Sequence, residues 1–437
     1  MSFQQGISGL NAASRNLEVI GNNIANANTV GAKVARAEFG DVYANAALHQ
    51  ISAAPGMGVQ LSAVTQQFGQ GSIRSTENPM DMAINGPGFF CVSAPGASAD
   101  KAYTRNGQFQ LDNQGFIVTN QGMRLQGYAV DAASGKAAGV MGDVQLPAQG
   151  IGPHVTAEGS LALNLDGRTP APAASAPVFA LNNASSYSSS TSMSVYDQQG
   201  NEHVLSMYFR RTAVDNEWEV YSAMDGAAIP AVAAGGAQTP SGRLTFSPDG
   251  TLDPARSGKL AGAVFTAGDL ALDLPFPTST LPVGATGSAT SAPVTISFAR
   301  STQFGSAFGV TEVAQDGYTS GQLTGFVVDP DGMVLARYSN GETIAAAQIA
   351  LADFRNVQGL APVGGNLWRA TPASGQAAVS APGTANLGML KGGALEESNI
   401  DLTQQLVDMI TAQRAYQANA QTIKTQDQMM STLVNLR

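Results

Sequence analysis

The sequence contains little cysteine, little histidine and little charge. Cys91 is the single cysteine among 437 residues, so no disulfide can form within the chain. His49, His154 and His203 lie far apart, without the close spacing of a metal site. Charged residues make up 12% of the chain, whereas an average soluble domain has about 25%. We therefore expect packing alone to hold the fold together.

Basic residues and long apolar runs are also scarce. Lys and Arg total 22 against 32 Asp and Glu, and the net charge is −10. Because nucleic acids bind clustered Lys and Arg, this balance argues against a nucleic-acid partner. No apolar run approaches the ~18 residues of a membrane span, and the N-terminus lacks the basic start and apolar block of a cleavable signal peptide. We expect no membrane insertion, and taken alone these signals favour a cytosolic protein.

Apolar residues recur every seven positions at both ends of the chain. The N-terminal stripe consists of Phe3, Leu10, Leu17 and Ile24, with Gly6, Ala13 and Ile20 three positions after the first three. The C-terminal stripe consists of Leu402, Met409, Tyr416, Ile423 and Met430. Residues at this spacing share one face of a helix, as in coiled coils. The sequence therefore predicts a terminal helical coiled-coil domain of residues 1–30 and 398–437.

Capping signals indicate where these helices end and begin. Asparagines accumulate before Gly31, and their low helix propensity followed by glycine indicates the end of the first helix. The second helix is predicted to begin near residues 398–401, where Ser or Asn can cap and Asp401 favours the positive helix end. Glu396 and Glu397 are expected at this helix start, where they would complement the helix dipole rather than act as acid and base.

The two stripes can be buried in two ways. They can pack on each other or on the core of the same molecule, which is the usual case. However, they lie at the extreme ends of the chain, and two helices alone bury too little surface for independent stability. We therefore expect association with copies of the chain, with the stripe residues as the assembly interface.

The chain between the stripes has the pattern of β structure, with short alternating segments separated by turn residues. Residues 109–118 and 326–335 each predict a hairpin around a turn that ends in glycine. Residues 149–300 are richer in Ala, Ser, Thr and Pro, which predicts an inserted outer β domain. It would interrupt an inner β domain of residues 73–148 and 301–384, with 31–72 and 385–397 as connecting segments. The predicted fold class is mainly β with α-helical termini.

No motif predicts an active site. Cys91 lies in the segment FFCV, where a small buried hydrophobe is a better interpretation than a reactive thiol. Turns at residues 247–250 and 329–332 lack the later ligands of calcium loops. A Ser, a His and a carboxylate could still meet in space, but no nucleophile elbow is present at a plausible strand-to-helix turn. We expect no enzyme and no catalytic, metal-binding or cofactor-binding residues.

Several specific segments carry a resemblance to one protein family. They are residues 8–14 (SGLNAAS), 20–26 (IGNNIAN), 28–31 (NTVG), 78–84 (NPMDMAI), 88–90 (GFF), 103–107 (YTRNG), 338–341 (YSNG), 351–354 (LADF), 398–402 (SNIDL) and 409–416 (MITAQRAY). With these motifs the chain resembles the bacterial flagellar rod and hook axial proteins over most of its length. Ala32 replaces the family's usual Phe, and Met80 and Met82 replace commoner leucines, so local packing there is expected to differ.

The resemblance implies a structural subunit of the flagellar hook that is exported by the flagellar type III apparatus without cleavage. It implies assembly into an extracellular helical tube, a universal joint between rod and filament that transmits motor torque. The implied partners are copies of the chain, the distal rod protein, the hook–filament junction protein, the hook cap and the export apparatus. A distal rod protein is the alternative within the family, although it is shorter and lacks the second domain.

Two other classes of function remain open: a secreted β-rich adhesin or carbohydrate binder, and an extracellular hydrolase. Both explain the middle of the chain, but neither needs seven-residue stripes at both termini. Electron microscopy of concentrated protein would distinguish them, because only an axial protein is expected to form tubes.

Overall fold

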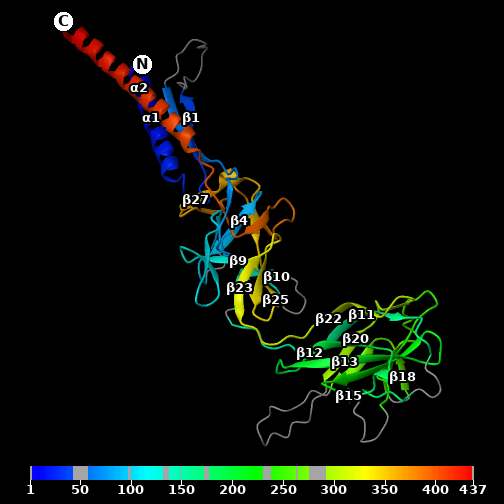
Figure 1. The fold of residues 1–437 in the computed structure, drawn as a ribbon. Helices are drawn as coiled ribbons and strands as arrows, with labels where there is room; N and C mark the ends of the chain where they lie inside the picture. The colour runs from blue at the N-terminus through cyan, green and yellow to red at the C-terminus, as the bar shows by residue number, and fades with distance from the viewer. Residues whose placement is uncertain are drawn as a thin grey trace, which may run out of the picture. The chain divides into compact units, whose positions relative to one another are not determined.

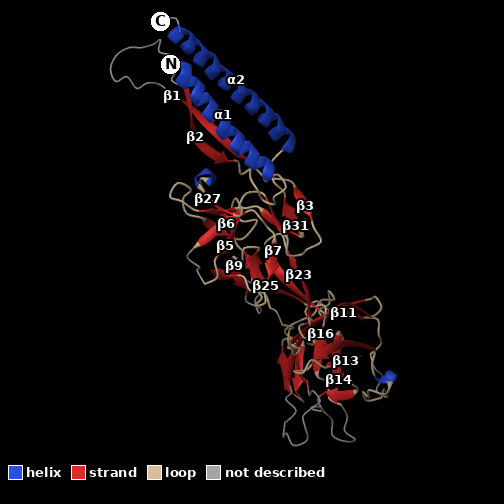
Figure 2. Ribbon diagram, turned by 90° about the vertical axis from the view of Figure 1, so that its left-hand side faces the viewer, coloured by secondary structure: helices blue, strands red, loops and turns tan. Residues whose placement is uncertain are grey.

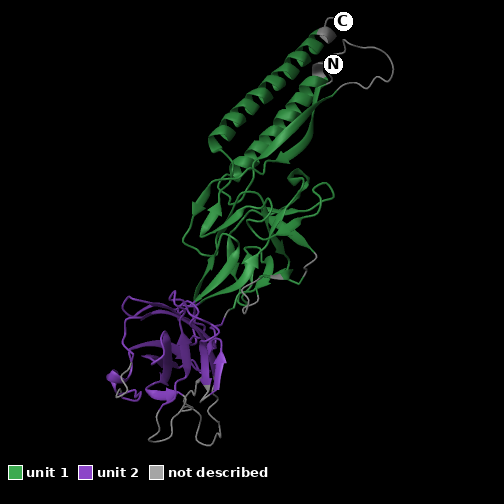
Figure 3. Cartoon of the chain, turned by 90° about the vertical axis from the view of Figure 1, so that its right-hand side faces the viewer, with its two compact units in different colours: residues 1–148, 324–337, 343–437 green, residues 149–323, 338–342 purple. Residues whose placement is uncertain are grey.

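The computed structural model describes residues 2–42, 58–96, 100–130, 137–147, 149–171, 177–229, 238–261, 264–274 and 292–435. A helix lies at each end of this part of the chain and strands make up most of the rest, which confirms the predicted fold class. The chain divides into two compact units (Figure 3). Unit 1 comprises residues 1–148, 324–337 and 343–437, and unit 2 comprises residues 149–323 and 338–342.

Unit 1 begins and ends with the two long helices, α1 (Ser2–Ala25) and α2 (Leu402–Asn435). They lie side by side and antiparallel, with the two termini at the same end (Figure 1). Asp401 caps α2, because its Oδ1 accepts hydrogen bonds from the amides of Thr403 at 2.8 Å and Gln404 at 3.2 Å. The predicted start of the second helix is therefore confirmed.

A two-stranded antiparallel sheet packs against α1 (Figure 2). It consists of β1 (Ala35–Val42) and β2 (Gly58–Gln66). Residues 31–72 were expected only to connect the helix to the β structure, and the structure differs in placing this hairpin within them. The helical part of unit 1 is thus three-layered at its base, with β1 and α2 on different sides of α1.

The β part of unit 1 is a sheet of 13 strands whose main path runs β23-β24-β25-β9-β5-β6-β28-β27. Its strands are β5 (Phe89–Ser93), β6 (Lys101–Thr104), β7 (Phe109–Leu111), β8 (Ile117–Thr119), β9 (Arg124–Val130), β10 (Ala137–Asp143), β23 (Leu323–Val328), β24 (Met333–Tyr338), β25 (Thr343–Ile349), β26 (Leu351–Asp353), β27 (Ala361–Gly364), β28 (Leu367–Arg369) and β29 (Ala378–Ser380). A short 3₁₀ helix, η2 (Val357–Gly359), precedes β27. The predicted hairpins are observed as β7–β8 and β23–β24.

Two small sheets join this β part to the ends of the chain. β3 (Ile73–Ser75) pairs with β31 (Ala394–Glu396), and β4 (Met82–Asn85) pairs with β30 (Met389–Gly392), both antiparallel. One apolar core of unit 1 is aromatic: the rings of Phe89 and Trp368 meet edge to face at 5.8 Å, and Cys91 is fully buried in the same cluster. The C-terminal segment is therefore part of the sheet structure until just before α2.

Unit 2 consists of two sheets that enclose one apolar core. The five-stranded sheet contains β11 (Glu158–Asp166), β19 (Leu270–Leu274), β20 (Ala292–Ser297), β21 (Thr302–Phe304) and β22 (Gly309–Gln315). The seven-stranded sheet contains β12 (Ser189–Tyr196), β13 (Glu202–Arg211), β14 (Glu217–Met224), β15 (Ala227–Ile229), β16 (Gly242–Thr245), β17 (Gly258–Ala261) and β18 (Val264–Ala267), and η1 (Ala184–Ser186) precedes it. Leucines of β11 face Met207, Phe209 and Trp218 of the other sheet in the core.

The division between the units differs from the predicted boundary at residue 300. β21 and β22 follow that residue, yet they pair with β11 of unit 2. Unit 2 therefore continues to residue 323 and also takes in the turn at 338–342. Composition changes near residue 300, but strand pairing decides to which unit a segment belongs.

Candidate functional site: the paired helices and their root

The contact between α1 and α2 is built on small residues of α1. A Cβ atom added to Gly9 would lie 2.9 Å from Nδ2 of Asn419, and one added to Gly6 would lie 3.0 Å from Cγ1 of Ile423. Ala13 of α1 and Ala412 of α2 are buried. We call the contacting and buried residues of the two helices the seam: Gly6, Gly9, Ala13, Ile20 and Asn23 of α1, and Gln405, Ala412, Asn419 and Ile423 of α2. The helices thus pack on each other within one chain.

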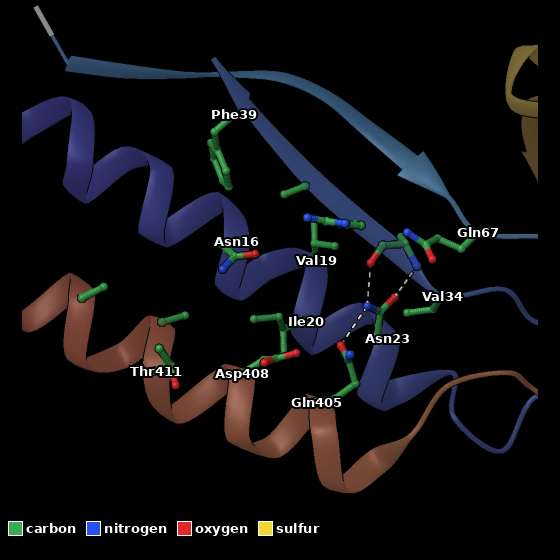
Figure 4. Close-up of a pocket in the computed structure, with 15 residues that line it drawn as sticks. Asn16, Val19, Ile20, Asn23, Val34, Phe39, Gln67, Gln405, Asp408 and Thr411 are labelled. Carbon is green, nitrogen blue, oxygen red and sulfur yellow. Dashed lines mark hydrogen bonds between the residues drawn. The ribbon is translucent and has the colours of Figure 1, made fainter. Parts of the chain in front are cut away.

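A buried amide fixes the register of the seam (Figure 4). Nδ2 of Asn23 donates to Oε1 of Gln405 at 2.9 Å and to the carbonyl oxygen of Ala35 at 2.8 Å. Oδ1 of Asn23 accepts from the amide of Ala35 at 2.9 Å. One side chain therefore holds α1, the start of β1 and the first turn of α2 together. Because a buried polar group loses its partners when helices slip, such a residue specifies one register.

A groove of about 600 Å³ lies between α1, β1 and α2. Val19 and Ile20 of α1, Phe39 of β1 and Thr411 of α2 line it (Figure 4). The lining combines apolar side chains with Asn16, Asp408 and Arg36, which form no set of catalytic groups. Within the described residues, no three His, Cys, Asp or Glu side chains come close enough together to hold a metal ion.

Of the seven-residue stripe positions, Ile423 contacts α1 at Gly6, and the others differ in how far they are buried. Leu10, Leu17 and Ile24 are partly buried on α1, and Met409 is partly buried on α2. Leu402, Tyr416 and Met430 are exposed, and the side chain of Phe3 lies outside the described part of the chain. The seam contains Gly6, Ala13 and Ile20, which belong to the same predicted stripe three positions after Phe3, Leu10 and Leu17. The small side chains of Gly6 and Ala13 allow close approach of the helix backbones.

An apolar face of α2 includes one residue of the predicted stripe, Leu402, and three residues outside it. Leu402, Leu406, Val407 and Ile410 are between 39% and 54% exposed. At 3.6 residues per turn, these positions lie on the side of α2 away from the seam. We call these four residues the open face. Leu402, Leu406 and Ile410 follow one another at a spacing of four residues, which was a signal in the sequence, but the seven-residue stripe was the longer pattern.

Three charged side chains are buried at the root, the place where the chain segments flanking both helices cross. Nζ of Lys33 lies 2.6 Å from Oε1 of Glu396, and Nη1 of Arg105 lies 3.2 Å from Oε2 of Glu396. The Lys33 and Glu396 side chains are 0% exposed. Burial lowers the pKa of Lys33 and of Arg105, because a charged group loses its hydration there, although the Glu396 carboxylate opposes both shifts.

The position of Glu396 corrects the sequence interpretation. It ends β31 and does not belong to the start of α2, so it pairs with buried cations instead of complementing a helix dipole. Its neighbour Glu397 is partly exposed and pairs with Arg74 at 3.2 Å. Sequence reasoning had no signal for the pair with Lys33, which is 363 positions away. Ala32 beside Lys33 lines a cavity of about 320 Å³ next to Trp368.

Cys91 is fully buried in β5, and burial raises the pKa of its thiol to about 12. A thiol with such a pKa is protonated at neutral pH and is a poor nucleophile. The interpretation of Cys91 as a small buried hydrophobe is therefore confirmed. Among the described helices, none is both long and apolar enough to cross a membrane.

Comparison with family models assigns most of the chain to flagellar axial proteins. Residues 3–33 match the model "Flagella basal body rod protein", 83–163 match "Flagellar hook protein FlgE/F/G D1 domain", 164–318 match "Flagellar basal body protein FlaE D2 domain" and 391–436 match "Flagellar basal body rod FlgEFG protein C-terminal". The third match falls within unit 2, the first covers all of α1 but Ser2, and the last includes α2.

Full-length relatives agree with these matches. The flagellar hook protein FlgE of Escherichia coli is 39% identical over 443 aligned positions, covering 100% of both chains. FlgE of Treponema pallidum is 32% identical, covering 100% of this chain and 99% of the relative. The crystal structure of Helicobacter pylori FlgE2 has a similar fold, with a TM-score of 0.50, 14% identity and coverage of 74% of this chain and 100% of that one. The chain therefore belongs to the flagellar hook protein family, a family of structural proteins.

Proposed function

We propose that the chain is a structural subunit of the flagellar hook that polymerises into a helical tube through its terminal helices. The observation that carries this proposal is the open face of α2. Four apolar side chains on the side away from α1 remain exposed in the single chain. Covering these side chains by another copy would remove their apolar surface from water.

The geometry of the helix pair favours a contact that continues from copy to copy. The open face lies on one side of α2, whereas the groove lies between α1, β1 and α2. Contacts between different patches of identical chains do not have to close into a ring and can generate a helix. The proposed interface contains the open face. Tyr416 and Met430, exposed stripe residues on the seam side of α2, form a second part of it. Ile423 of the predicted stripe belongs to the seam within the chain.

The finer parts of this function rest on membership of the family. The tube joins rod to filament as a universal joint and transmits motor torque, and its ends contact the distal rod protein, the hook cap and the hook–filament junction protein. Subunits reach the extracellular flagellum through the type III export apparatus without a cleaved signal peptide. A distal rod protein is less well supported, because full-length relatives are hook proteins and residues 164–318 match a D2 domain.

A pair of substitutions in α2 tests the proposal. Ile410→Asp places a carboxylate on the open face, where burial between copies would cost several kcal/mol or force its protonation. Thr422→Asp adds the same charge to an exposed position outside both the open face and the seam. Polymer is measured by sedimentation and electron microscopy, and monomer folding by thermal melting.

We expect wild type and Thr422→Asp to form tubes, and Ile410→Asp to stay in the supernatant with an unchanged melting temperature. Full polymerisation of Ile410→Asp would show that the open face is not an interface between copies. Failure of concentrated wild-type protein to polymerise under any condition would contradict the proposed function itself.

A further inference from the structure

We propose that Lys33 is the positioning residue of the two terminal helices: its buried ammonium group fixes where the N-terminal segment crosses the C-terminal one, and so where both helices stand on the β part of unit 1. The consequence for polymerisation rests on the proposed function. The placement within the chain does not.

Lys33 follows α1 closely in the sequence and contacts a residue that closely precedes α2. It lies between the end of α1 at Ala25 and the start of β1 at Ala35. Its partner Glu396 ends β31, shortly before α2 begins at Leu402. Arg105 follows β6, a strand of the large sheet. The three side chains therefore tie the segment after α1 and the segment before α2 to the β part of the same unit.

The charge balance at the root indicates a role beyond stability. The pair of Arg105 and Glu396 is already neutral, so Lys33 adds a second buried cation. Its ammonium group also donates to the carbonyl oxygen of Gly69 at 2.8 Å. A buried charge that its surroundings do not need for neutrality costs desolvation energy, and an apolar side chain would avoid that cost. The ammonium group instead specifies one placement of the N-terminal segment, because its hydrogen bonds to Glu396 and to the carbonyl oxygen of Gly69 are both satisfied in that placement.

Backbone hydrogen bonds around Lys33 follow the same crossing. The amide of Gly31 donates to the carbonyl oxygen of Glu396 at 2.9 Å, and the amide of Val34 donates to Oδ1 of Asn399 at 2.8 Å. Nδ2 of Asn399 in turn donates to the carbonyl oxygens of Gln67 and Gly69. The amides of Gly31 and Val34 therefore both donate to acceptors in the few residues before α2. The N-terminal and C-terminal segments are thus hydrogen-bonded to each other at the crossing.

The space around the crossing is too tight for alternative placements. Gly31 has φ +70°, and a Cβ atom there would lie 2.7 Å from the backbone nitrogen of Asn106. A Cβ atom on Gly71 would lie 2.0 Å from the carbonyl oxygen of Glu397. Backbone contacts this close are available only to glycine.

The length of α2 turns a small change at the root into a large displacement. The helix has 34 residues, which span about 50 Å at ~1.5 Å per residue. A rotation of about 10° at the root would therefore move its far end by about 9 Å, more than one turn of helix. In a polymer, every subunit would carry this displacement of α2. We therefore expect a substitution at the root to impair assembly more than it impairs folding of the single chain.

The test compares Lys33→Met with the matched control Lys391→Met in the full chain. Met keeps the length and apolar character of the lysine stem but removes the ammonium group. Lys391 is an exposed lysine of β30, in the same unit. Three quantities are measured: the melting temperature, the hydrogen exchange of residues 34–42 in the monomer, and the critical concentration for polymer formation well below the melting temperature.

For Lys33→Met we expect a folded monomer, faster exchange in residues 34–42 and a critical concentration at least tenfold higher, with irregular polymers. Lys391→Met should match wild type in all three. If Lys33→Met has the same hydrogen exchange in residues 34–42 and the same critical concentration as the wild type, the proposal is overturned. If wild-type protein does not polymerise, the proposed function fails, and the exchange measurement still decides the positioning role.

Asn399→Ala provides a second variant in case Lys33→Met does not fold. It removes the hydrogen bonds to Val34, Gln67 and Gly69 without leaving a buried charge unpaired. We expect the same direction of change in exchange and in critical concentration. Normal exchange and normal assembly of this variant would show that the crossing does not position the helices.

Discussion

The side-chain amide of Asn23 donates a hydrogen bond to Gln405 at 2.9 Å and thereby joins two helices whose contacting residues are 382 positions apart. The same amide takes both the donor and the acceptor role toward the backbone of Ala35. Asn23 is almost fully buried. A single side chain therefore completes the hydrogen bonding of three elements at the base of the helix pair.

Asn23→Ala is expected to destabilise the helix pair by about 2 kcal/mol or more, because it leaves buried polar groups of Ala35 and Gln405 without this partner. Urea unfolding followed by the far-ultraviolet helix signal measures the change. Asn22→Ala serves as the control, since Asn22 is exposed on the same helix. Equal stability of the two variants would show that the Asn23 amide does not hold the register.

Two glycines of α1 should respond to substitution in opposite directions. Gly9→Leu places a large side chain where Asn419 is already within 2.9 Å of an added Cβ, and such overpacking costs about 2 kcal/mol. Gly21→Ala meets nothing within 4 Å and should stabilise the helix by about 0.5–1 kcal/mol. Thermal melting of the helical signal compares them. A Gly9→Leu variant as stable as wild type would contradict the close helix contact.

Asp166 in β11 offers a test of charge and pH in unit 2. Hydrogen bonds from the Arg168 side chain, and then from its backbone, lower the pKa of the Asp166 carboxyl to about 2. Because the folded pKa lies below the ordinary value of 3.8, its stabilising contribution is fully present above pH 3.8. This contribution is lost as the pH falls from there toward 2.

Arg168→Met should therefore raise the pKa of Asp166 toward 3.8, as measured by titration of the carboxyl carbon by NMR. Arg300→Met removes the ion pair with Glu312 in the same unit and should leave Asp166 unchanged. A pKa of Asp166 that stays near 2 without Arg168 would refute this cause.

Cys91 should react with thiol reagents only when the β part of unit 1 unfolds. Its side chain is inaccessible, and burial raises its pKa to about 12, so thiolate is scarce at neutral pH. Labelling with a disulfide reagent is expected to be slow in buffer and complete within the mixing time in denaturing urea. Gln413→Cys, on the exposed surface of α2, should add one rapidly labelled thiol. Rapid labelling of native wild-type protein would contradict the buried position.

Local patterns in the sequence were enough to predict both long helices and several hairpins. Seven-residue periodicity, the cap at Asp401 and the turns that end in glycine act over a few neighbouring residues. They predicted α1, α2 and hairpins such as β7–β8. The absence of cysteine pairs and metal ligands likewise indicated a fold that depends on packing.

Contacts between distant segments were decided only by the tertiary structure. The pair of Lys33 and Glu396, the extension of unit 2 to residue 323 and the contact of Gly9 with Asn419 all join residues that are remote in sequence. A seven-residue pattern shows that a helix has an apolar stripe, but the partner across the contact selects the face that is buried. That selection depends on side-chain size, as in the fit of Gly9 to Asn419, and on hydrogen bonding, as in Asn23 and Gln405. Both are properties of a pair of surfaces brought together by the fold.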